Sequence, residues 1–156
     1  MTKELKQEYT FRISQANRTE MVVIIYEMLL DYLNDARAAL AEDDMQEFHE
    51  SIRRSTACIR ELISSINFDS DVSQNLLSLC VYCTKELSKA DLHHTAEELY
   101  HVELVMNKLH AAFKEIASND DSAPIMNNSQ VVYAGLTYGK ESLVIHLNDN
   151  NRGYKV

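Results

Sequence analysis

The sequence predicts an all-α protein, an antiparallel four-helix bundle with an extended N-terminal arm and a non-helical or weakly structured C-terminal tail. Glycine and proline, which mark most tight turns, are absent before Pro124. Four stretches in that region repeat their apolar residues at steps of three and four, the period of one helical face. Short polar junctions with N-capping residues separate them. Long helices on short connections are typical of an antiparallel bundle.

The chain begins with a polar segment, residues 1–16, that leads into a very apolar helix at about 17–41. The apolar residues of the segment are isolated, which predicts an extended arm. In the helix, Asn17 offers an N-cap and Glu20 follows three residues later, as in a capping box. A helix that is apolar on nearly all sides must be covered on several of them, so we expect it at the centre of the molecule. The isolated apolar residues of the arm are Tyr9, Phe11 and Ile13.

Three further helices are predicted at about 44–67, 71–91 and 95–117. Each begins with a residue that can cap a helix, followed three residues later by an acid or an amide. The last helix alternates its apolar steps between three and four, which suits near-antiparallel packing. The predicted capping pairs are Asp44 with Glu47, Asp71 with Gln74, and Thr95 with Glu98.

The helical period ends at Ala117, so we predict a four-helix domain over residues 1–117 and a linker with a C-terminal tail over 118–156. The linker is rich in Ser, Asn and Asp, as linkers commonly are. In the tail, apolar residues alternate, and Gly139 with Lys140 is placed like a two-residue hairpin turn. A lone hairpin is marginal in water, so the tail docks on the bundle, docks on a partner, or stays disordered. The alternating residues are Leu143, Ile145 and Leu147.

Composition and charge exclude several classes of function. The net charge of −9 and the lack of a basic cluster argue against nucleic acid as a partner. No stretch approaches the roughly 18 uncharged apolar residues of a membrane span, which excludes stable membrane insertion. The N-terminus lacks the apolar core of a signal peptide, and three cysteines are an odd number. We therefore expect a cytoplasmic protein in a reducing compartment.

Two motifs invite a chemical interpretation. Glu98 and His101 have the helical spacing with which di-iron bundle proteins bind metal, but such sites need the motif on two helices and it occurs once here. A ferritin-like or other helical-bundle metalloenzyme is nevertheless the alternative hypothesis. Cys80 and Cys83 form a C-x-x-C within an apolar helical stripe, which favours a buried structural pair over a redox or zinc site. We find no nucleophile with a base and an orienting acid, and predict a protein that is not an enzyme and needs no cofactor or metal.

Several short patterns follow one another in a fixed order along the chain. Tyr9 in the arm is followed by the helix start 13–18, which includes Ile13, Ala16 and Arg18, and by the run 24–27 within the first helix. Later patterns are Glu61-Leu62, then Asn75, Leu76, Leu79, Cys80 and Tyr82, then Glu86, Leu87, Ala90 and Asp91, and finally Ala112, Phe113, Glu115 and Ile116.

From Tyr9 to about Ile116 these patterns resemble the FliS family of flagellin export chaperones. Members of that family carry a tyrosine in an N-terminal arm, a V-x-T-A-S-P-type helix start and a Leu-rich first helix. The chain departs from the family pattern at several positions. Arg18 replaces the helix-start proline, Cys80 a tyrosine, and Phe113 a tryptophan. Lys85 and Glu86 replace an arginine pair.

The resemblance implies a cytoplasmic, non-enzymatic chaperone. Such a protein binds the disordered C-terminal segment of flagellin, prevents its premature polymerisation and delivers it to a component of the flagellar type III export gate. A disordered apolar segment can fold into helices on an apolar groove, which masks its sticky face until export. The arm is expected to cover the groove until flagellin displaces it. The predicted partner-binding residues are Tyr9 and Ile13 in the arm, and Ile25, Leu29, Asn75, Leu79 and Tyr82 in the groove.

Overall fold

The computed structural model describes residues 1–66 and 71–126 of the chain. Within those ranges the backbone forms five α-helices and no strand, which confirms the all-α prediction. The hairpin predicted around Gly139 and Lys140 lies outside the described residues. The helices are α1 (Lys3–Gln15), α2 (Arg18–Ala41), α3 (Met45–Ser65), α4 (Asp71–His93) and α5 (Glu97–Ala117).

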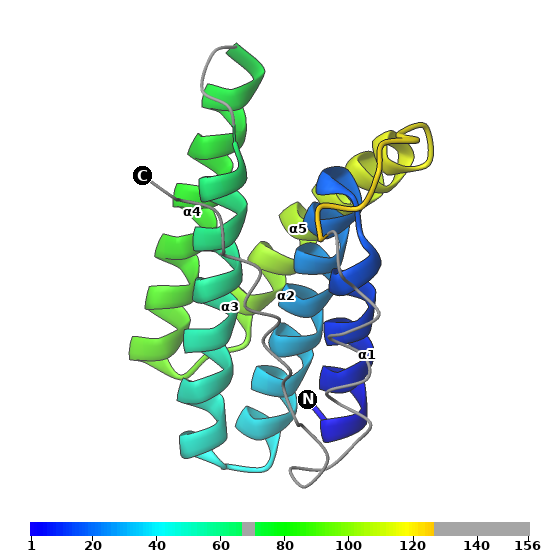
Figure 1. Ribbon diagram of the computed structural model, residues 1–156. Helices are drawn as coiled ribbons and strands as arrows, with labels where there is room; N and C mark the ends of the chain where they lie inside the picture. Colours follow the sequence, from blue (N-terminus) through cyan, green and yellow to red (C-terminus); the bar gives the residue numbers. More distant parts are fainter. Residues whose placement is uncertain (67–70, 127–156) are drawn as a thin grey trace, which may run out of the picture.

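Helices α2 to α5 pack in a closed ring, and α1 lies outside it (Figure 1). Helix α2 contacts α3 and α5, and α4 contacts the same two helices, so α2 and α4 stand opposite each other. Among the described helices, α1 contacts α2 alone. The extended arm predicted for residues 1–16 is therefore wrong, because residues 3–15 form a fifth helix docked on α2.

Local signals explain why α1 is a helix. The Thr2 side chain accepts a hydrogen bond from the backbone N–H of Leu5 at 3.2 Å, and the helix has an acid in its first turn and a base in its last. Leu5, Tyr9 and Ile13 recur at steps of four and share one face. This stripe is too narrow to predict a helix by periodicity, but it is wide enough to dock on the apolar surface of α2.

Predicted caps begin both α2 and α3. The Asn17 side chain accepts from the backbone N–H of Glu20, and the Glu20 carboxylate accepts from the backbone N–H of Asn17, both at 2.8 Å. The Asp44 side chain accepts from the backbone N–H of Glu47 at 3.0 Å. Helix α2 contacts three other helices, which confirms its predicted central position. The largest fully buried side chains of the core are Tyr26, Leu29, Leu33, Phe48, Ile59, Leu87, Leu99 and Met106.

The start of α5 differs from the prediction. The capping residue is Ala96, which provides no side-chain cap, and the Thr95 hydroxyl instead bonds to the Glu98 carboxylate. His94 adopts a left-handed conformation with φ of 54° after the end of α4. The turn at His94 ends α4, and α5 begins only after Ala96. The N-cap position of α5 is therefore one residue later than the sequence pattern indicates.

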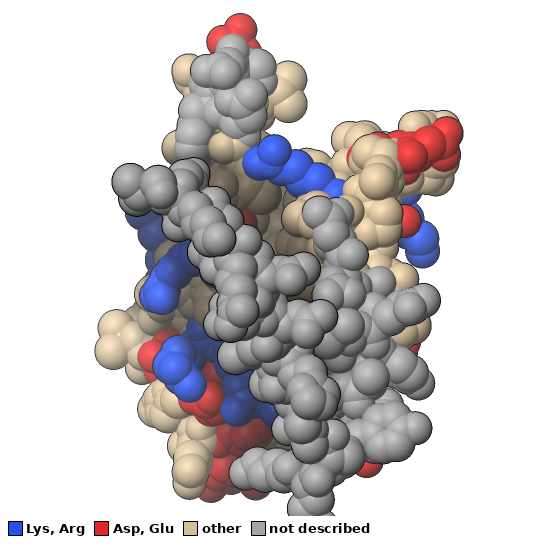
Figure 2. All heavy atoms as spheres, viewed as in Figure 1, with Lys and Arg blue, Asp and Glu red and all other residues tan. Residues whose placement is uncertain are grey.

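Charge is distributed unevenly over the surface. Figure 2 shows acidic side chains at the end of the molecule where α2 turns into α3, and basic side chains over the side formed by α3 and α4. Glu42, Asp43 and Asp44 lie in that turn. Within residues 1–66 and 71–126, no helix is both long and apolar enough to cross a membrane.

Candidate partner-binding site

Helix α1 runs antiparallel to α2 and buries one apolar stripe against it. Tyr9 is only 5% exposed and packs with Ala16 and Ile24 in a small core that is separate from the main one. The predicted arm residue Tyr9 therefore lies against the first long predicted helix. The partly buried residues around this small core are Met1, Leu5, Ile13, Met21 and Met28.

Three carboxylates on α2 hold α1 by polar contacts. The Tyr9 hydroxyl donates to the Asp31 carboxylate at 2.6 Å, and the Arg12 guanidinium pairs with Glu27 at 2.5 Å. The N-terminal ammonium group of the chain pairs with the third carboxylate. Residues four apart lie above one another on a helix, so these acids form a row on a largely apolar helix. That row is the signal that could have revealed a docked helix in the sequence. It consists of Glu27, Asp31 and Asp35.

Burial favours the protonated form of the Tyr9 hydroxyl. Desolvation raises the pKa of Tyr9 above its ordinary value, and the hydrogen bond to Asp31 raises it further. The hydroxyl therefore remains a donor throughout the physiological pH range. The Arg12 guanidinium also lies over the Tyr9 ring, 5.5 Å from its centroid. One aromatic residue thus connects the apolar and the polar contacts of α1.

An apolar groove of about 370 Å³, here called the α1–α3 groove, lies between α1, α2 and α3. It brings together two predicted site residues, Ile13 from α1 and Ile25 from α2. Burial raises the pKa of the Cys58 thiol to about 12, so this thiol adds no charge to the groove at neutral pH. The lining residues are Ile13, Met21, Ile25, Met28, Tyr32, Arg54, Ala57, Cys58 and Glu61.

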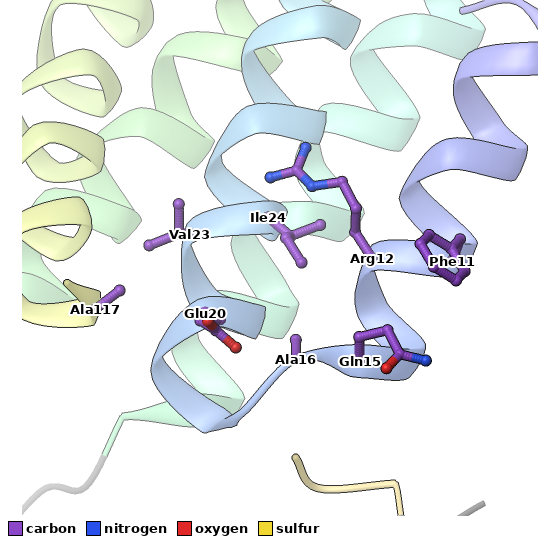
Figure 3. Close-up of a pocket in the computed structure, with 8 residues that line it drawn as sticks. All are labelled: Phe11, Arg12, Gln15, Ala16, Glu20, Val23, Ile24 and Ala117. Carbon is purple, nitrogen blue, oxygen red and sulfur yellow. The ribbon is translucent and has the colours of Figure 1, made fainter. Parts of the chain in front are cut away.

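A second cavity, of about 290 Å³, flanks α1 on its other side (Figure 3). In Figure 3, Val23 and Ile24 of α2 lie between Ala117 at the end of α5 and Arg12 of α1. Helix α1 therefore has open space on both sides and rests on α2 between them. The lining residues are Phe11, Arg12, Gln15, Ala16, Glu20, Val23, Ile24 and Ala117.

The remaining predicted groove residues do not join the α1–α3 groove. Leu29 is fully buried in the main core and does not line the α1–α3 groove, so its contact with a partner stays a prediction. Asn75, Leu79 and Tyr82 are exposed on α4, whose backbone packs on α3 and α5 among the described helices. Steps of four and three place these three residues on one face, here called the α4 face. Leu79 and Tyr82 are 38% and 42% exposed, which is high for large apolar side chains.

Sequence reasoning missed a pocket of about 360 Å³ where α3 ends and α4 begins. Val72 in the first turn of α4 is 75% exposed, and Leu76 follows one turn later. Apolar residues in the first turns of a helix, where polar ones are common, were the available signal. The lining residues are Val22, Tyr26, Leu62, Ser65, Ile66, Val72, Ser73, Leu76, Cys80 and Phe113.

The two chemical motifs have structural partners. His101 Nδ1 lies 3.1 Å from Glu86 Oε2, whereas Glu98 bonds to Thr95, so the Glu-x-x-His residues do not converge. In the described part of the chain, no group of three or more His, Cys, Asp or Glu side chains could hold a metal. Burial raises the pKa of Cys80 to about 11. The pKa of Cys83 is raised to about 12, and burial is the largest cause. Both thiols are therefore neutral core groups at physiological pH.

Comparison with known proteins agrees with the pattern of residues. The family model described as "Flagellar protein FliS" matches residues 1–120, which include all five helices. A search of curated proteins finds no significant match. A family model that covers most of the chain establishes membership, so the chain belongs to the FliS family of flagellar export chaperones.

Proposed function

We propose that this protein is a cytoplasmic export chaperone for flagellin. It binds the disordered C-terminal segment of flagellin, prevents premature polymerisation, and delivers the segment to a component of the flagellar type III export gate. The observation that carries the proposal is an apolar groove, partly closed by a lightly held helix, in a chain of the FliS family.

The α1–α3 groove is the proposed primary site. A disordered segment that folds into an amphipathic helix needs an apolar groove for its buried face, and the groove offers Ile13, Ile25 and Met28. Tyr9 and Ile13 belong to α1, which contacts α2 and no other described helix. Release of α1 would lengthen the groove along α2, and the lost α1 contacts would reduce the net affinity. The helix thereby covers apolar surface in the free chaperone.

The α4 face is the proposed second contact. Asn75, Leu79 and Tyr82 combine two exposed apolar side chains with an amide that can satisfy a backbone group of a bound segment. A long disordered segment can wrap over surfaces that are far apart, because it orders only on binding. We therefore propose that one flagellin segment contacts both the α1–α3 groove and the α4 face.

Calorimetric titration with the flagellin C-terminal segment tests these two surfaces separately. Ile25→Asp places a charge in the α1–α3 groove, and Leu79→Asp places one on the α4 face. Leu92→Asp is the matched control, since Leu92 is 76% exposed near the end of α4. A desolvated, unpaired carboxylate costs about 1–3 kcal/mol or more, so we expect each site variant to weaken binding roughly tenfold or more. The control should bind like the parent.

Circular dichroism of each variant separates lost binding from lost folding. A folded Ile25→Asp protein with parental affinity would place the primary site elsewhere. Parental affinity of Leu79→Asp alone would confine the site to the α1–α3 groove. If the unmodified chain shows no binding to the flagellin segment, the proposed function itself is wrong.

A further inference from the structure

The segment that follows α5 returns to the junction between α1 and α2. We call residues 118–126 the strap and residues 16–19 the elbow. Figure 1 shows the strap in yellow, beside the place where α1 passes into α2. The backbone N–H of Ile125 donates to the carbonyl of Ala16 at 3.1 Å, which fixes the far end of the strap to the end of α1.

Asn17 connects the elbow to the strap through its side-chain amide. Nδ2 of Asn17 donates to the carbonyls of Asp120 at 3.0 Å and Ser122 at 3.4 Å. Oδ1 of the same amide caps α2 by accepting from Glu20. Asn17 is only 3% exposed, so both halves of the amide are used away from water. The side-chain oxygen of Asn17 therefore caps α2, and its side-chain nitrogen binds the strap.

A second side chain of the elbow strengthens the connection. The Thr19 hydroxyl donates to the Asp120 carboxylate at 2.5 Å, and the backbone N–H of Ser122 donates to the other oxygen at 3.0 Å. These hydrogen bonds, that from Thr19 first, hold the pKa of Asp120 below its ordinary value. The carboxylate is therefore ionised at neutral pH, and its hydrogen bonds are charge-assisted.

The elbow is the only covalent connection of α1 to the ring. Because α2 is the one described helix that α1 contacts, undocking of α1 requires rotation of the backbone around Ala16 and Asn17. The strap bonds to both of these residues and to Thr19. Bonds on either side of a hinge resist changes in its dihedral angles. The strap thus acts on α1 without any need to cover its apolar stripe.

We propose that the strap is a latch on the elbow, which keeps α1 docked on α2 and sets how often α1 leaves. The family match ends at residue 120, so most of the latch lies beyond it. The latch concerns the free protein and does not require the proposed function. If flagellin is the partner, the latch also limits how fast the α1–α3 groove is extended.

Amide hydrogen exchange of the full-length chain tests the latch through Asn17→Asp. Aspartate keeps the oxygen that caps α2 and replaces the Nδ2 donor by a second oxygen, which repels the strap carbonyls. We expect exchange of the α1 amides to accelerate roughly 5- to 30-fold, as for the loss of one or two hydrogen bonds. Exchange in α3 and α4 should stay at the parental rate.

Two further variants make the result specific. Thr19→Val removes the hydroxyl that bonds to Asp120 and should accelerate the same α1 amides. Asn34→Asp makes the same chemical change at an exposed position of α2 and should leave α1 unaffected. Parental exchange of α1 in both Asn17→Asp and Thr19→Val would overturn the latch. Equal acceleration in all helices would also overturn it, because the strap would then act on global stability.

Discussion

At the residue scale, Tyr9 is the side chain on which the docking of α1 depends most. It is nearly fully buried, donates to Asp31, and packs on Ile24. Tyr9→Ala removes all of these contacts, and truncation of a buried aromatic residue costs about 3–5 kcal/mol. Because α1 has one neighbouring helix, we expect this variant to undock α1 while α2 to α5 stay folded. Hydrogen exchange should show loss of α1 protection, with little change in helicity by circular dichroism.

Tyr9→Phe separates the two kinds of contact. It keeps the ring on Ile24 and removes only the hydroxyl, so it should cost about 1 kcal/mol and leave α1 mostly docked. Parental protection of α1 in Tyr9→Ala would contradict the assignment of Tyr9 as the main anchor.

The C-x-x-C pair makes a prediction about pH. Burial raises the pKa of Cys80 to about 11 and that of Cys83 to about 12, from an ordinary value of 9.0. Between about pH 9 and 11 the unfolded chain loses these protons while the folded chain keeps them, so the free energy of unfolding should fall as pH rises. The double variant Cys80→Ala, Cys83→Ala should show a flatter dependence and a stability lower by about 1–3 kcal/mol at pH 7.

Urea unfolding at several pH values measures both effects. Partner binding should survive the double substitution, because both thiols are buried in the core. A pH dependence as steep as that of the parent would show that the thiols do not titrate in this way. Tyr26, whose pKa is raised first by burial and then by the nearby thiols of Cys80 and Cys83, also contributes to the slope, and the double variant loses the part of that shift that comes from the thiols.

At the element scale, local chemistry predicted helix starts better than it predicted docking. Asn17 with Glu20 and Asp44 with Glu47 begin helices as the sequence indicates, since each cap depends only on neighbouring residues. Thr95 fails as a cap because the preceding turn at His94 decides where α5 begins. Helix α1 was missed for a related reason. Its narrow stripe becomes a helix face only when α2 is there to cover it.

The periodicity of a helix that is apolar on nearly all sides does not show which of its faces is buried in the core. Helix α2 is apolar on nearly all sides, so its sequence does not show which residues face the ring and which face α1. Leu29 therefore proved to be a core residue, whereas Ile25, one turn earlier, lines the α1–α3 groove. On α4, Asn75 and Leu79 share a face as their spacing requires, but only the packing of the ring shows that this face points to solvent.

At the scale of the whole molecule, the ring and α1 differ in how firmly they are held. Among the described helices, every helix of the ring contacts at least two others, whereas α1 contacts one. Elements with few buried contacts open at a lower free energy than the rest of a fold. The molecule therefore combines a stable ring with a helix that can leave without unfolding it. The proposed function, in which α1 covers the apolar groove and then exposes it, depends on this difference.

Two truncations test the proposed boundary between the helical domain and the segment that follows it. All five helices and the whole main core end by Ala117, so residues 1–117 should fold cooperatively. This fragment lacks the strap, and the loss of its hydrogen bonds to Ala16, Asn17 and Thr19 should lower the stability of α1 docking by about 1–3 kcal/mol.

Residues 1–126 keep the strap and serve as the matched control, because the two fragments differ only by residues 118–126. Urea unfolding followed by circular dichroism measures the ring, and hydrogen exchange measures α1. We expect the same cooperative midpoint for the ring in both fragments, with faster exchange of α1 in the shorter one alone. Loss of cooperative unfolding in residues 1–117 would mean that the boundary is wrong and that the strap belongs to the core of the domain. Equal exchange rates of the α1 amides in the two fragments would instead mean that the apolar stripe with Tyr9 and Ile13 holds α1 without the strap.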